Sequence, residues 1–351
     1  MYPALAVLQT LTNSTETTLW VGGQGGMEAA LIQRAGIPFA AIPAAGVHGV
    51  GLRSLPRNLL QILRGVRAAN RLIKEFKPDV LLFTGGYVAA PMALAARKIP
   101  TLLYVPDIEP GLALKFLVRF ADIIAVTAPA SKAFLPETKR VEITGYPTRP
   151  ELTRWDRSAA LAQFDIQGKK PVLLVFGGSK GARSINRALL AHLPDLLQRC
   201  EIIHISGNLD WPEVETMQKS LAPELSSQYH AFAYLHEEMG AALAAADLVV
   251  SRAGASTLGE YPLFGLPAIL VPYPYAWRYQ KVNADYLVQQ GAAVLLRDED
   301  LLARLSDVVL DILDRPEELA RMKQAALNLA HPDASAQIAA LLRELAGGQP
   351  V

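Results

Sequence analysis

Short apolar runs alternate with longer amphipathic stretches along the whole chain. Each run has the length of a buried strand, and the stretches between them carry apolar residues at the 3.6-residue spacing of a helix. The strand-like runs lie at 18–21, 80–83, 101–104, 123–126 and 141–143, and again at 171–176, 201–205, 231–233, 248–251, 268–271 and 293–296. This alternation is typical of parallel sheets covered by helices.

The alternation stops once, at Gly145-Tyr-Pro-Thr-Arg-Pro150, where the glycine and prolines cannot continue a helix. We therefore expect an α/β fold with two doubly wound, Rossmann-like domains facing a central cleft. The predicted domains cover residues 1–150 and 151–331. A final helix is predicted within 332–351, with Asp333 as its N-cap, and it is a candidate for packing back on the N-terminal domain.

Composition narrows the class of protein. A chain of 351 residues that is 51% hydrophobic suits two domains with full cores. Its net charge of +1 gives no global field for nucleic acid, so no nucleic-acid partner is expected. The single cysteine, Cys200, excludes an intrachain disulfide and a multi-cysteine metal site. We find no signal peptide and no apolar run of membrane-spanning length, which predicts a soluble, unsecreted protein.

The segment after the run 248–251 is the most informative one. It reads Arg-Ala-Gly-Ala-Ser-Thr-Leu-Gly-Glu260, which predicts a glycine loop opening a helix. Unpaired amides of Ser256 and Thr257 would stabilise a diphosphate there. Glu260 lies one turn further on, where its carboxylate can accept both hydroxyls of a ribose. The alternative is a capping box, in which Thr257 and Glu260 bind only backbone.

Two further glycine loops follow strand-like runs. Gly177-Gly-Ser-Lys-Gly181 follows 172–176, and Ser179 is either a phosphate ligand or a helix N-cap. Thr84-Gly85-Gly86-Tyr87 follows 80–83 and is a candidate for a second diphosphate. Asp298-Glu-Asp300 matches a metal-chelating pattern, but acids directly before a helix stabilise its N-terminus. We expect no metal site and no cofactor.

The stretch from Arg53 to Lys77 predicts a basic amphipathic helix. It contains seven basic residues and one acid, Glu75, interleaved with leucine, isoleucine and valine. Such a helix can dock on an anionic membrane surface, with its cations toward the lipid headgroups. The alternative is an ordinary solvated helix that packs some of its leucines on the sheet.

Taken in order, these motifs resemble the MurG family of peptidoglycan glycosyltransferases. The resemblance spans nearly the whole chain and is far more specific than any one glycine loop. It rests on the segments Lys77–Val80, Gly85–Val88, Gly145–Arg149, Gly177–Asn186, His204–Gly207, Asp247–Glu260 and Gln280–Ala284. It implies a GT-B fold and a metal-independent, inverting transfer of N-acetylglucosamine from UDP to the undecaprenyl-linked acceptor lipid I, on the cytoplasmic face of the plasma membrane.

The resemblance also implies roles for individual residues. UDP and its diphosphate would meet Arg149 and Ser179, and the ribose would meet Glu260. Uracil would contact the backbone of His236, beside Leu235 and Met239. Hydroxyls of the transferred sugar would face Gln280, with Asn283 a weaker candidate. The donor turn would comprise Ala255, Ser256, Thr257, Leu258 and Gly259. The acceptor pyrophosphate would face Gly85, Gly86 and Tyr87, and the helix from Arg53 to Lys77 would meet the anionic inner membrane.

Two departures from the family pattern bear on activity. Family members begin with a strand and a Gly-Gly-Thr-Gly-Gly-His loop before the segment matching Tyr2–Ala6, so we expect the translated protein to begin upstream of Met1. Tyr104-Val-Pro-Asp107 replaces the family's His-Glu-Gln-Asn, and Leu114 its frequent Asn. Asp107 or Glu109 is then the candidate general base. The alternatives are a GT-B enzyme for another glycolipid and a UDP-sugar-binding protein that has lost catalysis.

Overall fold

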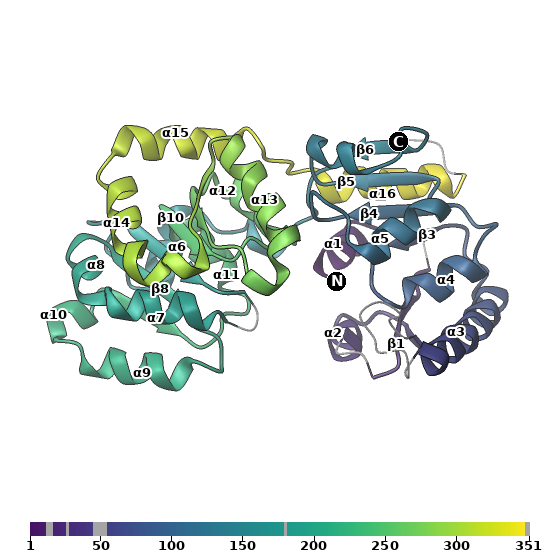
Figure 1. Ribbon diagram of the computed structural model, residues 1–351, viewed down its shortest axis with the longest axis horizontal. Coiled ribbons are helices and arrows are strands. Elements are labelled where there is room, and N and C mark those ends of the chain that lie inside the picture. Colours follow the sequence, from purple (N-terminus) through teal and green to yellow (C-terminus); the bar gives the residue numbers. More distant parts are fainter. Residues whose placement is uncertain (12–16, 26–27, 45–54, 179–180, 348–351) are drawn as a thin grey trace. The chain divides into compact units, whose positions relative to one another are not determined.

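The computed structural model describes residues 1–11, 17–25, 28–44, 55–178 and 181–347 (Figure 1). The chain divides into two compact units. Unit 1 comprises Met1–Pro147 together with Asp333–Val351, and unit 2 comprises Thr148–Pro332. The final helix, α16 (Ala334–Leu345), therefore belongs to the same unit as the amino-terminal part of the chain.

Unit 2 is built on one six-stranded parallel sheet with the order β12-β11-β10-β7-β8-β9. The chain starts in the middle, at β7, builds outward to β9, and then returns to β10 on the other side of β7. This reversal is the doubly wound arrangement that the alternating pattern predicts. The strands are β7 (Val172–Phe176), β8 (Glu201–Ile205), β9 (Tyr229–Phe232), β10 (Leu248–Ser251), β11 (Ala268–Leu270) and β12 (Ala293–Leu295).

Both faces of this sheet are covered, as a parallel sheet requires. On one face, Leu173 and Val250 join a core cluster with α7, α8 and α14. On the other face, Leu174 and Val249 are also fully buried. The helices of unit 2 are α6 (Arg157–Gln163), α7 (Arg183–Ala191), α8 (Leu193–Arg199), α9 (Trp211–Ser220), α10 (Pro223–Ser226), α11 (Met239–Ala245), α12 (Glu260–Phe264), α13 (Trp277–Gln289), α14 (Leu301–Leu313) and α15 (Pro316–Leu327).

Unit 1 contains two parallel sheets within the described residues. The larger has the order β3-β4-β5-β6, and the smaller pairs β1 with β2. The strands are β1 (Trp20–Gly23), β2 (Phe39–Ile42), β3 (Leu81–Phe83), β4 (Thr101–Val105), β5 (Ile123–Val126) and β6 (Arg140–Ile143). The helices are α1 (Tyr2–Leu11), α2 (Glu28–Arg34), α3 (Leu55–Phe76), α4 (Ala89–Ala95), α5 (Leu112–Leu117) and α16.

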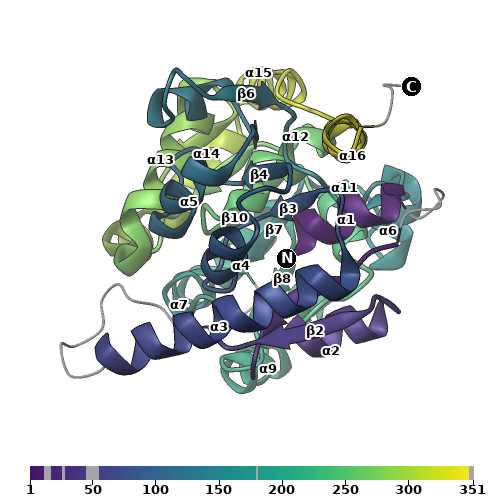
Figure 2. The ribbon, with the colours of Figure 1, turned by 90° about the vertical axis from the view of Figure 1, so that its right-hand side faces the viewer.

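Helices on the surface of unit 1 pack through small residues and ion pairs. Helix α3 runs across the front of unit 1 in Figure 2 and packs along α4. Gly65 permits close packing on two sides, because a Cβ there would lie 2.2 Å from the carbonyl oxygen of Pro43, after β2, and 3.1 Å from the Cβ of Pro91 in α4. Helix α16 contacts α1 and β4, and Arg140 of β6 forms an ion pair with Glu344 of α16.

The predicted α/β architecture with parallel sheets is confirmed, and two local expectations need correction. Strand β2 was not predicted, because its short Phe-Ala-Ala-Ile sequence lies between Pro38 and Pro43 and lacks a strong β-branched pattern. Asp333 does precede α16, but its side chain makes no capping hydrogen bond. Among the described helices none is both long and apolar enough to cross a membrane.

Candidate active site

Two loops of unit 2 leave the sheet side by side at its carboxyl edge. Phe176, the last residue of β7, is the register partner of Ser251, the last residue of β10. The chain order reverses between these two strands, and in doubly wound sheets ligands bind in the crevice outside the carboxyl ends of such a pair. The loops starting at Gly177 and Arg252 therefore occupy the position where a nucleotide is expected.

The loop after β7 is tightly folded. Gly178 and Gly181 have φ angles of +87° and +78°, a region that favours glycine, and the Gly181 amide donates to the Gly178 carbonyl at 3.0 Å. A Cβ on Gly181 would lie 2.3 Å from the Ser206 carbonyl oxygen, so this loop rests directly on the turn after β8. Ser179, the predicted phosphate ligand, lies outside the described residues.

The loop after β10 differs from the predicted helix N-terminus. Gly254 leads into a 3-10 turn over Ala255–Leu258, and α12 starts only after a break at Gly259. The Thr257 amide and hydroxyl both bond the Gly254 carbonyl, at 3.0 and 2.7 Å. The expectation of an unpaired Thr257 amide was wrong, and so was the capping-box alternative, because Thr257 does not cap α12. Among the described residues no hydrogen bond engages the amides of Ala255 and Ser256, the first two residues of this turn.

Glu260, the first residue of α12, lies against this turn. The Ser256 hydroxyl hydrogen-bonds its carboxylate, and the positive charge of Arg149 acts on it from the segment that enters unit 2. Burial raises the pKa of Glu260 to about 7, while Arg149 and Ser256 both lower it. Arg149, more than a hundred residues away in sequence, thus acts on a carboxylate and a hydroxyl that the turn itself brings together.

His236 lies in the loop that follows β9 and precedes α11. Its ring is exposed and meets the Tyr234 ring edge-on at 4.7 Å between centroids. Its backbone N–H donates to the Glu238 carboxylate at 3.2 Å. A base bound to the His236 backbone would therefore use the carbonyl, or the N–H after displacing Glu238.

Gln280 and Asn283, both on α13, have different surroundings. Gln280 is half-buried, and its side-chain oxygen accepts the Tyr273 N–H at 2.8 Å. Asn283 is fully buried and donates to the Ala253 carbonyl at 3.2 Å. Asn283 therefore holds the donor turn in place and does not present its amide to a sugar.

The acidic segment Asp298–Asp300 precedes α14, as expected, but Asp300 makes no side-chain cap there, and the carboxylates bind other side chains. The Asp298 carboxylate accepts from Arg252 at 2.5 Å and from the Ser184 hydroxyl at 2.7 Å, and Asp300 pairs with Arg297. Arg252 also donates to the Val271 carbonyl and to the Ser184 hydroxyl, so three protein groups engage its guanidinium. The described part of the chain contains no group of three or more acidic, histidine or cysteine side chains placed to hold a metal.

A buried polar network beneath the β7 loop was not predicted. Neutral His204 lies between the Tyr229 hydroxyl and the Asn186 amide, at 2.7 and 3.0 Å, and burial lowers its pKa to about 3. Asn186 also donates to the Ser206 carbonyl and to Asp210, which in turn binds Arg183. The network fixes the turn on which Gly181 rests. The sequence did contain a sign of this network, because His204 of β8 and Asn186 of α7 are polar residues at positions where the pattern is otherwise apolar.

In unit 1, the glycine loop and the candidate bases also leave one sheet edge together. Strands β3 and β4 are neighbours, so the segment with Gly85 and Gly86 and the segment with Asp107 start side by side. Both glycines have positive φ angles, +99° and +88°, and Tyr87 is exposed. The Pro106 carbonyl accepts from the Thr127 hydroxyl at 2.9 Å, which anchors the backbone next to Asp107.

The two candidate bases are not equivalent. Glu109 is buried, and Lys115 donates to its carboxylate at 2.7 Å. That ion pair holds the carboxylate in place inside unit 1. Asp107 is half-buried and lies nearer the end of β4. The geometry therefore favours Asp107 as the group that meets a substrate.

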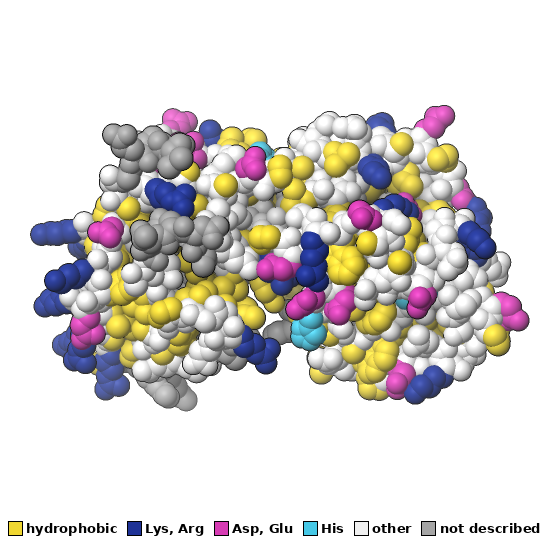
Figure 3. All heavy atoms as spheres, turned by 180° about the vertical axis from the view of Figure 1, so that it is seen from behind, with side chains coloured by type: hydrophobic (Ala, Val, Ile, Leu, Met, Phe, Trp, Pro, Cys, Tyr) yellow, Lys and Arg dark blue, Asp and Glu magenta, His cyan; other side chains and the backbone are white. Residues whose placement is uncertain are grey.

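Helix α3 presents apolar and cationic side chains together. Leu59, Leu60 and Leu63 are 50%, 46% and 55% exposed near its start. Further along the helix, Arg64, Arg67, Arg71 and Lys74 are exposed, and none of them forms an ion pair within the described residues. In Figure 3 basic side chains gather over this part of unit 1. Arg53, the predicted start of the helix, lies outside the described residues.

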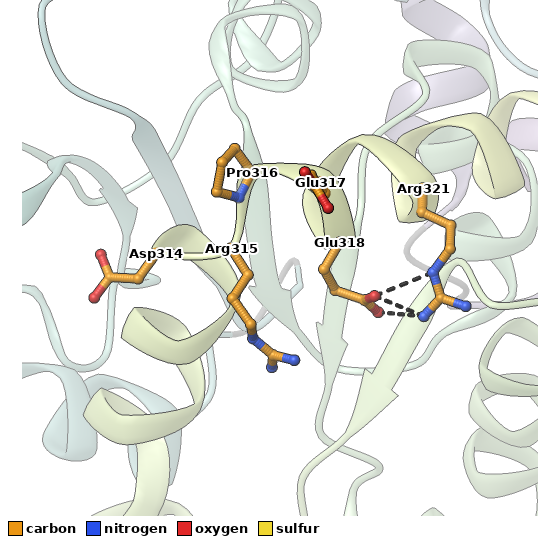
Figure 4. Close-up of a pocket in the computed structure, with 6 residues that line it drawn as sticks. All are labelled: Asp314, Arg315, Pro316, Glu317, Glu318 and Arg321. Atoms are coloured by element: carbon orange, nitrogen blue, oxygen red, sulfur yellow. Dashed lines mark hydrogen bonds and ion pairs between the residues drawn. The ribbon is translucent and has the colours of Figure 1, made fainter.

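A surface pocket at the start of α15 is a weaker candidate for a ligand site (Figure 4). Four of its five charged groups are already paired: Asp314 with Arg199, Arg315 with Asp311, and Arg321 with Glu318. It also lies away from the carboxyl edge of the sheet, where the loops converge. The pocket is lined by Asp314, Arg315, Pro316, Glu317, Glu318 and Arg321.

Comparison with known proteins agrees with this geometry. The glycosyltransferase family 28 N-terminal domain matches residues 1–126, and the family 28 C-terminal domain matches residues 172–338. The chain is 44% identical to the UDP-N-acetylglucosamine--N-acetylmuramyl-(pentapeptide) pyrophosphoryl-undecaprenol N-acetylglucosamine transferase of Roseiflexus sp., over 94% of this chain and 84% of that relative. It is 38% identical to the protein of the same name from Desulforamulus reducens, over 96% and 93%.

Solved structures give the same result. The Acinetobacter baumannii MurG crystal structure is 28% identical and superposes with a TM-score of 0.78, covering 98% of this chain and 95% of that one. A putative UDP-N-acetylglucosamine 2-epimerase from Listeria monocytogenes, 16% identical with a TM-score of 0.67 over 98% and 92% of the two chains, shares only the fold. The chain belongs to the MurG family of GT-B glycosyltransferases, within glycosyltransferase family 28.

Proposed function

We propose that this chain transfers N-acetylglucosamine from UDP to the muramyl sugar of an undecaprenyl-pyrophosphate-linked acceptor, lipid I, to give lipid II. The observation that carries the proposal is the grouping of Glu260, Ser256 and Arg149 beside the donor turn. It lies at the carboxyl edge of a doubly wound sheet in a chain whose curated relatives carry the name of this transferase.

The donor half of the reaction uses unit 2. The Glu260 carboxylate accepts hydrogen bonds from the ribose hydroxyls. The amides of Ala255 and Ser256, with Arg149, stabilise the negative charge that builds on the departing diphosphate. Since Arg149 and backbone amides supply this stabilisation, we propose that the reaction needs no divalent metal.

The acceptor half uses unit 1. The acceptor hydroxyl oxygen attacks the anomeric carbon, the bond from that carbon to the UDP oxygen breaks, and the configuration inverts. The proton of the attacking hydroxyl passes to the Asp107 carboxylate. The positive-φ turn of Gly85 and Gly86 faces the acceptor pyrophosphate with its amides.

We also propose that α3 docks the enzyme on an anionic membrane surface as a peripheral protein at the cytoplasmic face. The exposed leucines at the start of α3 enter the boundary between headgroups and acyl chains. The basic row from Arg64 to Lys74 meets anionic headgroups, each cation contributing roughly 1 kcal/mol. This places the enzyme where its lipid-linked acceptor resides.

The test is a transfer assay with UDP-N-acetylglucosamine and a lipid I analogue with a short prenyl chain. We expect disaccharide product and UDP in equal amounts, unchanged by a chelator. Glu260→Gln should raise the donor KM, while Glu317→Gln, an exposed carboxylate of unit 2 away from the turn, should not. Donor hydrolysis without disaccharide, or transfer that is equally fast with Glu260→Gln, would contradict the proposal.

A further inference from the structure

Two tyrosines after β11 form an exposed aromatic pair. Tyr273 and Tyr275 are 41% and 90% exposed, and their ring centroids lie 5.4 Å apart at an interplanar angle of 57°. A ring as exposed as that of Tyr275 gains nothing from burial within unit 2. Its face is available to a ligand.

The Tyr273 ring of this pair packs on the side chain of Arg252, which is itself held by several contacts. The Arg252 guanidinium lies 5.3 Å from the centre of the Tyr273 ring, and its side chain is only 11% exposed. Arg252 is in turn fixed by Asp298, by the Ser184 hydroxyl and by the Val271 carbonyl. The contacts that fix Arg252 thus also fix the guanidinium that packs on the Tyr273 ring.

Hydrogen bonding orients the neighbouring amide. Because the Tyr273 N–H donates to the side-chain oxygen of Gln280, the Gln280 NH2 group is the end of the amide that can turn toward a ligand. A hydrogen-bond donor therefore lies beside an aromatic face. Sugars are recognised by this combination, since each hydroxyl oxygen accepts hydrogen bonds and the ring carries an apolar C–H face.

The order of the loops along the sheet edge indicates which sugar is bound. His236 follows β9 at one side of the sheet, the turn from Gly254 to Glu260 follows β10, and Tyr273 follows β11 beyond it. A donor with its base at His236 and its diphosphate at the turn has only its sugar left to extend toward β11. Two contacts tie the β11 side to the turn: Arg252 to the Val271 carbonyl, and Asn283 to the Ala253 carbonyl.

We propose that the Tyr273–Tyr275 pair binds the pyranose ring of the nucleotide-sugar donor, with the C–H face of the sugar packed on the Tyr275 ring. The inference rests on the proposed function and extends it, because it assigns recognition of the sugar to residues distinct from those that hold UDP. Electron-rich aromatic faces attract such C–H groups. The pair therefore distinguishes UDP-sugar from UDP.

Calorimetry with UDP and with UDP-N-acetylglucosamine tests this on the full chain. Tyr275→Ala should weaken UDP-N-acetylglucosamine binding about tenfold and leave UDP binding within about twofold. Tyr275→Phe keeps the ring and should bind both ligands like the wild type. Leu302→Ala removes an exposed apolar side chain of the same unit, on α14, and should change neither affinity.

Several outcomes would overturn the inference. These are parallel losses of UDP and UDP-sugar affinity in Tyr275→Ala, no loss of either, or a change confined to the KM of the lipid acceptor. Failure of the wild type to bind UDP would instead remove the proposed function, and this inference with it. Because Tyr275 is so exposed, its substitution should leave the melting temperature unchanged, which circular dichroism checks.

Discussion

Gly181 touches the Ser206 carbonyl so closely that a single added methyl group would lie 2.3 Å from that oxygen. Its φ of +78° is a second obstacle to any other side chain. We expect Gly181→Ala to displace the loop after β7, at a cost of about 1–3 kcal/mol of strain. UDP affinity should fall with it, as measured by calorimetry.

A matched control separates this effect from the general cost of replacing glycine. Gly111 has a φ of −63°, and a Cβ there would meet nothing within 4 Å. Gly111→Ala should change the free energy of unfolding by no more than about 0.5 kcal/mol. If Gly181→Ala binds UDP as well as Gly111→Ala does, the loop after β7 does not hold the diphosphate.

The raised pKa of Glu260 predicts a dependence of donor binding on pH. With a pKa of about 7, the carboxyl is largely protonated at pH 6 and ionised at pH 8. The ionised form is the better acceptor for two ribose hydroxyls, so UDP affinity should rise across this interval. Calorimetry at both pH values measures the change, and Glu260→Gln should remove most of it.

The contribution of Glu260 to the free energy of unfolding should fall over the pH range in which donor affinity rises. The folded state holds a proton on Glu260 up to about pH 7, whereas the unfolded chain releases it near the ordinary carboxyl pKa of 4.5. The unfolded state therefore binds fewer protons across that window, and stability contributed by this group falls as pH rises. Thermal melting should show this. Relative to Glu260→Gln, the melting temperature of the wild type should be lower at pH 8 than at pH 5.

Substitution of the two acidic candidates in unit 1 should have different consequences. Asp107→Asn should lower turnover by about 10²- to 10⁴-fold, the usual contribution of a general base, with little change in UDP affinity. Glu109→Gln should lower the melting temperature, since it weakens the ion pair that holds the buried Glu109 carboxylate to the partly exposed Lys115. Normal turnover in Asp107→Asn would exclude Asp107 as the base.

Membrane docking through α3 can be separated from general electrostatic attraction. Arg67→Ser and Leu63→Asp should each reduce cosedimentation with vesicles that contain anionic lipid, and the loss from Arg67→Ser should shrink as salt is added. Arg304→Ser removes the same charge from an exposed position on α14 and serves as the control. Equal losses for Arg67→Ser and Arg304→Ser would argue against a specific docking surface.

Strand positions were predictable because parallel strands buried on both faces are continuous apolar runs. The runs at 123–126, 201–205 and 248–251 coincide with β5, β8 and β10. Strand β2 was not predicted, because two prolines flank a sequence rich in alanine. Periodicity reports burial, and a short strand with small side chains carries too little of that signal.

The loops were harder to predict than the strands. Sequence could propose Glu260 as a ligand because a carboxylate soon after a glycine loop has limited uses. It could not reveal that Thr257 bonds Gly254, or that Arg252 is held by Asp298 and Ser184. The Arg252 contacts depend on which loops the strand order brings together, and local spacing does not encode that order. The Thr257 bond depends on whether the turn is a 3-10 turn or the first turn of an α-helix, and the glycine pattern fits both.

Because α16 belongs to unit 1, truncation of the chain affects the two units differently. Unit 2 is one continuous segment from Thr148 to Pro332, so a cut at either of its ends leaves that unit whole. Unit 1 is assembled from two separated segments and loses the helix against α1 and β4 if synthesis stops early. A premature stop near residue 333 would therefore damage the amino-terminal half of the protein, while the carboxyl-terminal half kept its whole sheet.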